Sequence, residues 1–287
     1  FEAQMKDHYE LTVGGRLGPG PNDCKEATVL NRVIRWTKDC IEYEADPRQV
    51  ERFLEELDLS AEGVKGVVTP GVRPQQHQVA SKTVLGPEHH TRFRALAARA
   101  IYLAADRIDI LFAAKEVCRF MASPSDLAMA ALKRLGRYLK ERPRVVFKMP
   151  FQKCESIDVY SDTDWAGCPR TRKSTSGGIV CVGDHVIKTW SSTQSVIALS
   201  SGEAELYALN KAAAQAMGIQ SILNDLGVKL EIRLHTDATT GRTMATRRGL
   251  GKVRHIAVNE LWLQEKSAHG QPTILKIEKK FNLADIM

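Results

Sequence analysis

Apolar and polar residues alternate regularly in the second half of the chain. In the stretch IDVYSD, Ile157 and Val159 occupy one phase, while Asp158, Tyr160 and Asp162 occupy the other. A period of two is typical of a β-strand that has one face against a core. The stretch therefore predicts a strand that ends in carboxylates, where rigid backbone meets solvent.

Four further segments after Phe151 have strand character, namely GGIVCVG, HVIKTWS, LEIRLHTD and PTILKIEKK. Helical periodicity separates them and predicts helices over Glu203–Met217, Thr239–Arg247 and Ile256–Lys266. The final NLADIM is expected to be the first turn of a last helix. The order β-β-β-α-β-α-α-β predicts an α/β domain with a five-stranded sheet and flanking helices over residues 151–287.

The first half predicts a small α/β piece, a linker and a helical segment. ATVLNRVIRW and CIEYEA are interpreted as two strands, and Asp46 caps a helix that has Pro47 at its first position. Residues 60–87 are rich in Gly and Pro and predict an extended linker. Three helices are expected over residues 88–141, the third of them capped by Ser123.

The third of these helices has an apolar and a basic side. Its apolar side is predicted to be Leu127, Ala131, Leu135, Tyr138 and Leu139, and its polar side carries Lys133, Arg134, Arg137, Lys140 and Arg142. The basic side has two interpretations, a solvated face or a track of phosphate contacts. The sequence alone favours neither.

Composition narrows the class of protein. The chain has 287 residues with ordinary globular hydrophobicity, and its formal net charge of +7 favours a polyanionic partner. Six cysteines occur without a CxxC pair, so we expect reduced thiols in a cytoplasmic or nuclear protein. The sequence contains no apolar run of membrane-spanning length, so no membrane partner is expected.

Four carboxylates are expected at element ends. Asp162 and Asp237 each end a strand, Glu205 lies in the first turns of the Ala-rich helix, and Asp285 begins the final helix. Like charges brought together repel and raise each other's pKa, so the group requires cations. Two Mg²⁺ ions, with Mn²⁺ as an expected substitute, would serve in-line phosphodiester hydrolysis.

The segment from Ile157 to Met287 resembles the ribonuclease H domain of copia-type LTR retrotransposon polyproteins. The resemblance is carried by SDTDWAGCPRTRKSTSGG, TWSSTQSVIALSSGEAELYAL, LHTDATTG, KVRHI and NLADI. It implies a ribonuclease H-like mixed five-stranded sheet and cleavage of the RNA strand in RNA:DNA hybrids with two Mg²⁺ ions. The catalytic and metal-binding set that it implies is Asp162, Glu205, Asp237 and Asp285.

Two residues are near-duplicates of this set. Asp162 is preferred over Asp164 because it follows the strand directly, and Glu205 is preferred over Glu203 because it begins the Glu-Leu-x-Ala-Leu pattern. The sequence departs from the family in having no clear counterpart of the mobile histidine, since His269 precedes the fifth strand. The domain is also expected to be truncated shortly after its last aspartate.

The first half also resembles this polyprotein family. Residues 1–75 are similar to the end of the reverse transcriptase palm and thumb, and residues 76–150 to a linker and helical connection. A polymerase palm binds metal through an Asp-Asp pair, and this sequence contains no adjacent aspartates. No polymerase activity is therefore expected from this fragment.

Basic and hydroxyl residues near the carboxylates are candidates for nucleic-acid binding. The turn RRGLGKVRH is either a plain basic loop or a contact to the hybrid backbone, and the second is favoured by its acidic neighbourhood. The predicted contacts are Thr175, Ser176, Arg247, Arg248, Lys252 and Arg254. Trp165, Trp190 and Trp262 are interpreted as core residues and not as stacking platforms.

The leading functional hypothesis is an endonuclease for RNA:DNA hybrids, part of a retrotransposon polyprotein whose remainder is an expected partner. The alternative is a catalytically inactive nucleic-acid-binding remnant, and a third hypothesis is a purely structural connector. The complete set of four carboxylates favours the enzyme over the connector. A short C-terminal end and the missing polymerase motif keep the remnant in consideration.

Overall fold

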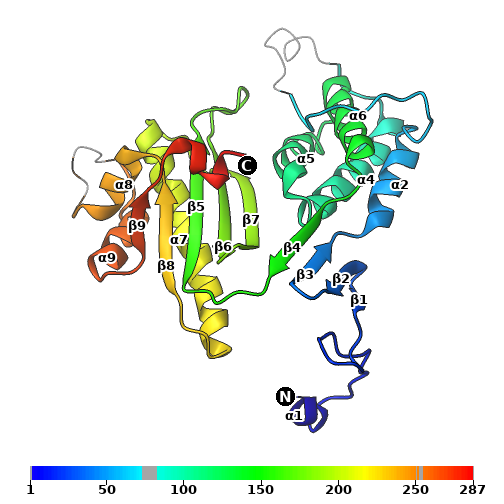
Figure 1. Cartoon of the computed structure of the whole chain (residues 1–287). Coiled ribbons are helices and arrows are strands. Elements are labelled where there is room, and N and C mark those ends of the chain that lie inside the picture. The colour runs from blue at the N-terminus through cyan, green and yellow to red at the C-terminus, as the bar shows by residue number, and fades with distance from the viewer. Residues whose placement is uncertain (1, 73–82, 250, 252–254, 287) are drawn as a thin grey trace.

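The computed structural model describes residues 2–72, 83–249, 251 and 255–286. The described chain forms two halves, each with its own β-sheet (Figure 1). A short helix, α1 (Glu2–Lys6), precedes them at the N-terminal end. None of the helices that the structure describes combines the length and apolar character needed to cross a bilayer.

The first sheet is antiparallel and has the order β1-β2-β3-β4. Its strands are β1 (Glu26–Val29), β2 (Arg32–Trp36), β3 (Cys40–Glu44) and β4 (Val146–Pro150). The prediction of one strand over ATVLNRVIRW is wrong, because Leu30 and Asn31 both have positive φ and turn the chain between β1 and β2. Strand β4 was not predicted from the sequence, and it pairs with β3 from about a hundred residues further along the chain.

A helical cluster packs beside this sheet around one apolar core that includes Phe53, Phe93, Leu96 and Leu135. It contains α2 (Pro47–Glu56), α4 (Pro87–Ala104), the 3₁₀ turn η1 (Ile108–Ile110), α5 (Leu111–Cys118) and α6 (Asp126–Glu141). The expected cap at the start of α2 is confirmed, because the Asp46 side chain accepts a hydrogen bond from the Arg48 N–H. Residues 1–75 and 76–150 therefore share one core and one sheet.

The start and register of α6 differ from the prediction. Ser125, and not Ser123, caps the helix, and its hydroxyl accepts from the Ala128 N–H. Leu135, Tyr138 and Leu139 are buried as predicted, whereas in the first half of the helix Ala131 is exposed and Leu132 is buried in its place. The helix itself was predicted, with its cap placed two residues early.

The basic side of α6 binds the chain's own backbone. Arg137 Nε donates to the Lys65 carbonyl at 2.7 Å, Lys140 Nζ donates to the Leu59 carbonyl at 2.9 Å, and Arg134 donates to the Thr69 hydroxyl. These contacts hold residues 59–69 across the helix. Part of the predicted linker is thus packed, and residues 73–82 of it lie outside the described residues.

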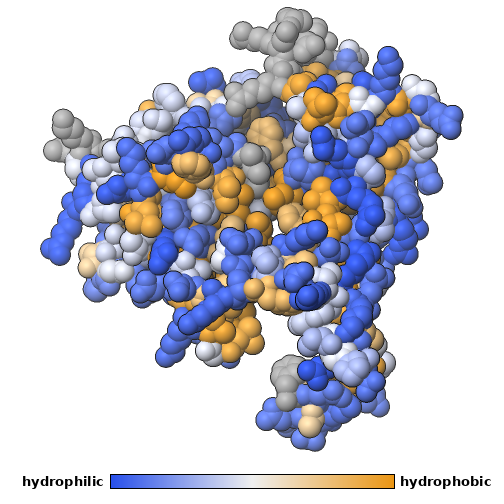
Figure 2. All heavy atoms as spheres, viewed as in Figure 1, coloured by the Kyte–Doolittle hydropathy of each residue, from blue (hydrophilic) through white to orange (hydrophobic). Residues whose placement is uncertain are grey.

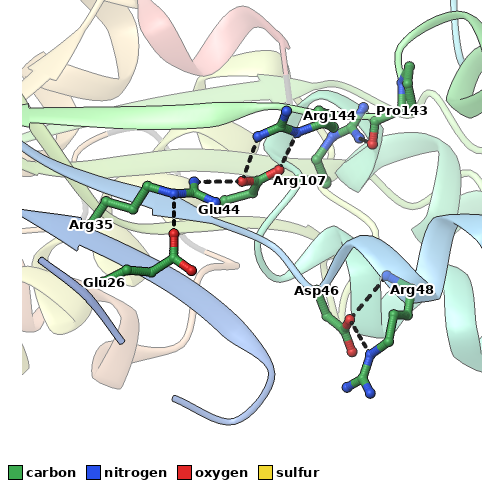
Figure 3. Close-up of polar contacts among 8 residues, drawn as sticks. All are labelled: Glu26, Arg35, Glu44, Asp46, Arg48, Arg107, Pro143 and Arg144. Carbon is green, nitrogen blue, oxygen red and sulfur yellow. Dashed lines mark hydrogen bonds and ion pairs between the residues drawn. The ribbon is translucent and has the colours of Figure 1, made fainter. Parts of the chain in front are cut away.

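An ion network reinforces the junction of β3 with the segment that leads into β4 (Figure 3). Glu44 is buried, and its carboxylate lies 2.5 Å from Arg144 Nε and 2.8 Å from Arg35. Hydrogen bonds from Arg144 and Arg35 lower the pKa of Glu44. Arg107, also buried, donates to the Pro143 carbonyl and so anchors the same segment.

The second sheet is mixed and has the order β7-β6-β5-β8-β9. Its strands are β5 (Ser156–Asp164), β6 (Thr175–Val182), β7 (His185–Thr193), β8 (Glu231–Thr236) and β9 (Thr273–Lys276). β5, β6 and β7 are antiparallel neighbours, whereas β8 and β9 run parallel to β5. The structure confirms the predicted α/β class and the mixed five-stranded sheet with flanking helices.

Helix α7 (Ser201–Asp225) packs against β5 and β6 and buries Leu206, Leu209 and Ala213 in the core of this half. It extends beyond the predicted end at Met217. The remaining helical elements are α8 (Thr239–Thr246), η2 (Val258–Leu261), α9 (Trp262–Ala268), η3 (Lys279–Phe281) and η4 (Leu283–Ile286). The last predicted helix is therefore a 3₁₀ turn in the described chain.

The two halves touch through α5. Lys115 is buried, and its Nζ donates to the Thr175 hydroxyl at 2.8 Å; Arg119 donates to the Cys168 sulfur at 2.5 Å. A cleft of about 320 Å³ lies between the halves and is lined in part by Tyr43, Phe147 and Val186. On the face shown in Figure 2, hydrophobic residues gather between the two halves and hydrophilic residues dominate elsewhere.

Candidate active site

The site is built at one end of the central strands of the second sheet. Asp162 lies near the end of β5, opposite Gly177 of β6. Asp237 directly follows β8, and because β8 runs parallel to β5, both aspartates emerge at the same sheet end. A strand end is a rigid support, so the position of each carboxylate is set by sheet pairing.

Asp285 is brought to the same place by the C-terminal segment. η4 packs against β5 and β6, and the Asn282 side-chain amide donates to the Ser161 carbonyl at 3.2 Å. The carboxylates of Asp162, Asp237 and Asp285 each contribute one oxygen to a group whose members all lie within 4.8 Å of one another. Three of the four predicted residues therefore form one cluster, and Asp285 is its most exposed member.

Glu205 lies beside this cluster, although it is not one of the three mutually close residues. It is 8% exposed, and its Oε1 accepts a hydrogen bond from the Thr163 hydroxyl at 2.9 Å. Its Oε2 is buried with no hydrogen-bond partner among the described residues. A Cβ on Gly241 would lie 2.6 Å from the Glu205 Cβ, so this glycine permits α8 to pack closely at this point.

The two near-duplicate acids have other contacts. Glu203 is buried and accepts from the Leu199 N–H and the Tyr207 hydroxyl, both at 2.9 Å, and lies 2.9 Å from His255 Nε2. It therefore organises the first turn of α7. Asp164 lies against Gly167, where an added Cβ would collide with its carboxylate. The geometry favours Asp162 and Glu205 over both.

Burial and mutual repulsion raise the pKa values of the acids. Burial and the neighbouring Asp237 and Asp285 raise the pKa of Asp162 to about 7. Burial and the same three aspartates raise the pKa of Glu205 to about 8, against the opposing hydrogen bond from Thr163. Asp162 and Glu205 therefore keep their protons to a higher pH than exposed acids do, because their ionised forms would be desolvated and would face other carboxylates.

Two predicted nucleic-acid contacts are wrong. Thr175 and Ser176 are 5% and 2% exposed in β6, which is an interior strand. The Thr175 hydroxyl accepts from Lys115, and the Ser176 hydroxyl accepts from the Gln194 amide at 2.9 Å. Their hydroxyls are therefore used inside the protein and are not presented to a phosphate.

The predicted basic turn follows α8. Arg248 is exposed, and the Arg247 guanidinium packs against Gly251. Lys252 and Arg254 lie outside the described residues. The assignment of these four cations as phosphate contacts stays a prediction.

We expect the double substitution of Lys252 and Arg254 by Ala to weaken hybrid binding equally for all sequences. Backbone contacts release counterions, so the log–log salt slope of binding should become shallower by about one unit per lost contact. Anisotropy titrations across a salt series measure it. Lys229→Ala, an exposed change beyond the far end of α7, is the matched control. An unchanged slope would assign the turn to a plain basic loop.

Sequence reasoning misjudged one aromatic residue and missed one polar residue at the site. Trp165 is 50% exposed, so its assignment to the core is wrong, whereas Trp190 is buried as expected. Trp165 lies one residue beyond the end of β5, where the alternation that buries side chains ends. This position was the signal in the sequence that its side chain is exposed. Thr163 donates a hydrogen bond to Glu205. It was not among the predicted site residues, because this contact between β5 and α7 depends on tertiary packing.

Comparisons with known proteins identify relatives of the chain. It is 29% identical over 227 residues to a retrovirus-related Pol polyprotein from transposon RE1 of Arabidopsis thaliana, covering 78% of this chain and 15% of the relative. The chain is also 28% identical over 184 residues to the retrovirus-related Pol polyprotein from transposon TNT 1-94 of Nicotiana tabacum. This match covers 63% of this chain and 14% of the relative. No family model matches.

Among solved structures, LC11-RNase H1 in complex with RNA/DNA hybrid is similar to 45% of this chain. That match has 17% identity and a TM-score of 0.32, and it covers 91% of the solved chain. The homologues from transposons RE1, RE2 and TNT 1-94 are Pol polyproteins of plant transposons, and the chain spans only 14% to 15% of their length.

Proposed function

We propose that this chain, a homologue of the retrovirus-related Pol polyproteins of plant transposons, hydrolyses the RNA strand of RNA:DNA hybrids with two divalent cations. The observation that supports this most directly is the cluster of Asp162, Asp237 and Asp285 within 4.8 Å, with Glu205 buried beside it. Carboxylates from four separate elements meet only at a cost in repulsion, which suggests a purpose other than stability.

The residues present fit divalent cations. Carboxylate oxygens are the preferred ligands of Mg²⁺ and Mn²⁺. The buried Glu205 Oε2 has no hydrogen-bond donor among the described residues, and a buried carboxylate oxygen without a partner is costly. We assign Asp162, Glu205, Asp237 and Asp285 as the residues that would hold the ions. When bound, the ions would supply the positive charge that activates water and stabilises the leaving oxygen.

The chain's own residues position this acidic group. Thr163 donates to Glu205 Oε1 and so aims the second oxygen of that carboxylate. Asn282 fixes the segment that carries Asp285 to β5, and parallel pairing of β5 with β8 sets the distance from Asp162 to Asp237. The pKa values of about 7 and 8 mean that Asp162 and Glu205 release protons when cations enter at neutral pH.

The proposed substrate is consistent with the charge of the protein. A net charge of +7 favours a polyanion, and Arg247, Arg248, Lys252 and Arg254 are the proposed backbone contacts near the site. Within the polyprotein, residues 1–75 would be the end of the reverse transcriptase palm and thumb, and residues 76–150 would connect them to this nuclease half. The remainder of the polyprotein is the proposed partner, in the cytoplasm or nucleus.

The test is a cleavage assay on a hybrid that carries a label on its RNA strand, with Mg²⁺ and with EDTA. We expect Mg²⁺-dependent cleavage of the RNA strand of the hybrid and none of double-stranded RNA or DNA. Binding of the hybrid without cleavage, in Mg²⁺ and in Mn²⁺, would contradict the proposal. That result would instead match the inactive nucleic-acid-binding remnant.

A further inference from the structure

A row of buried polar side chains connects the first half of the chain to the base of the candidate active site. Lys115, Thr175, Ser176 and Gln194 are each between 2% and 9% exposed. We name these four residues the buried polar row. Polar side chains lose their contacts with water on burial, and apolar side chains of similar size often fill such a space without loss of stability. Their presence here favours a role in setting the geometry of the fold.

The buried polar row begins on α5, the part of the helical cluster that faces the second sheet (Figure 1). Lys115 Nζ donates to the Thr175 hydroxyl at 2.8 Å, lies 2.8 Å from Glu116 Oε1 and lies 4.7 Å from the centre of the Phe112 ring. A carboxylate and an aromatic face both attract an ammonium group, so this buried cation is held in one position. Thr175 is the first residue of β6, and Lys115 therefore fixes the start of that strand.

The first route from Thr175 to the site acids runs through the sheet. Strand β6 pairs antiparallel with β5, and the two residues after Thr175 lie opposite Thr163 and Asp162. The Thr163 hydroxyl in turn donates to Glu205 Oε1 at 2.9 Å. A shift of the start of β6 would therefore displace both Asp162 and the hydroxyl that aims Glu205.

The second route runs through Gln194 to the backbone of α7. The Gln194 side-chain amide donates to the Ser176 hydroxyl and to the Ala204 carbonyl, both at 2.9 Å. The Gln194 N–H donates to the Ser174 carbonyl at 2.8 Å, so its backbone is held as well. Ala204 directly precedes Glu205 in the first turns of α7. Gln194 thus sets how far the helix that carries Glu205 lies from the sheet that carries Asp162.

We infer that Lys115 is a positioning residue for the proposed hydrolysis, and that through Thr175 it holds the strands and helix that bring Glu205 beside Asp162. This inference rests on the proposed function. The first half of the chain then sets the geometry of acids that all lie in the second half. A displacement of about 1 Å from a substitution far from the reacting groups can lower a rate by about a hundredfold. Loss of the Lys115 contact should therefore slow hydrolysis without weakening hybrid binding.

The central test compares Thr175→Val with Thr175→Ser in the full chain, because Val keeps the shape of Thr without the hydroxyl and Ser keeps the hydroxyl. The single-turnover rate constant for hybrid cleavage should fall about tenfold or more in Thr175→Val and in Lys115→Met, and less than about threefold in Thr175→Ser. The rate constant is the measured quantity, because a misfolded fraction lowers the amplitude instead. The double variant should be no slower than the slower single variant, since both changes remove one contact.

Two further measurements separate positioning from binding. Hybrid affinity by anisotropy in EDTA should change less than about twofold, because both side chains are buried and face no ligand. The Mg²⁺ concentration that gives half of the maximal rise in Tm should increase about threefold or more in Thr175→Val, because a displaced Glu205 fits a cation less well. Lys133→Met makes the same chemical change as Lys115→Met at an exposed position of α6 and should match the wild type throughout.

The outcomes distinguish this inference from the proposed function. If Lys115→Met does not fold in a thermal melt, Thr175→Val decides, since it keeps the volume of the side chain. A wild-type rate constant in folded Thr175→Val, equally slow cleavage by Thr175→Ser, or effects that multiply in the double variant would each overturn the inference while the proposed function stands. A wild type that neither cleaves hybrid nor gains stability from Mg²⁺ overturns both. If it gains stability without cleaving, the proposed function falls, and an unchanged Mg²⁺ dependence in Thr175→Val overturns the inference.

Discussion

Replacing Asp162 by Asn is expected to abolish cleavage of the hybrid and, in the same variant, to stabilise the metal-free protein. Asn keeps the size of the side chain but removes a charged ligand, so the rate should fall by about a thousandfold or more. The variant also removes one of the charges that face Asp237 and Asp285. Its free energy of unfolding in EDTA at pH 8 should therefore equal or exceed that of the wild type.

Asp164→Asn is the matched control, because it makes the same chemical change two residues along the same strand. Asp164 lies against Gly167 and is not one of the clustered carboxylates. Its cleavage rate should fall less than about tenfold. Cleavage rates and denaturant melts of both variants test this choice of Asp162 over Asp164. Full loss of cleavage in Asp164→Asn, with activity retained in Asp162→Asn, would make Asp164 the metal-binding residue instead.

The second large effect is a loss of metal-free stability as the pH rises. The pKa of Asp162 is about 7 and that of Glu205 about 8, both above the ordinary values of 3.8 and 4.5. Between pH 4 and 8 the folded state therefore binds more protons than the unfolded state, so the free energy of unfolding falls with rising pH. At about 1.4 kcal/mol per pKa unit, each of the two acids should account for a loss on the order of 4 kcal/mol.

Divalent cations should reverse this loss. Mg²⁺ binds the folded cluster, so at pH 8 a tenfold excess over its dissociation constant should raise Tm by about 3–5 °C. At pH 5 the protonated carboxyls should bind it weakly and the shift should be small. Calorimetry of wild type and Asp162→Asn, with and without Mg²⁺, isolates the site from other titrating groups. Parallel pH curves for the two proteins, or no shift with Mg²⁺, would contradict the two-cation site.

The sequence alone determined the elements that carry the site. Strand alternation through Val159 and Tyr160 placed Asp162 near the end of β5, and the same pattern in LEIRLHTD placed Asp237 after β8. Local patterns were sufficient here because a strand's two faces and a helix's buried side are set by a period of two or 3.6 residues. Helix α7 and its acidic first turns followed from the same reasoning, as did the five strands of the mixed sheet.

Only the tertiary structure decided what each side chain at the site touches. Glu203 and Glu205 differ by two residues, yet one bonds Leu199 and Tyr207 while the other meets Thr163 and the aspartates. Thr175 is covered by Lys115 from the other half of the chain, and β4 returns across about a hundred residues to β3. Such contacts join residues far apart in sequence, so their partners depend on how the elements pack and no local period encodes them.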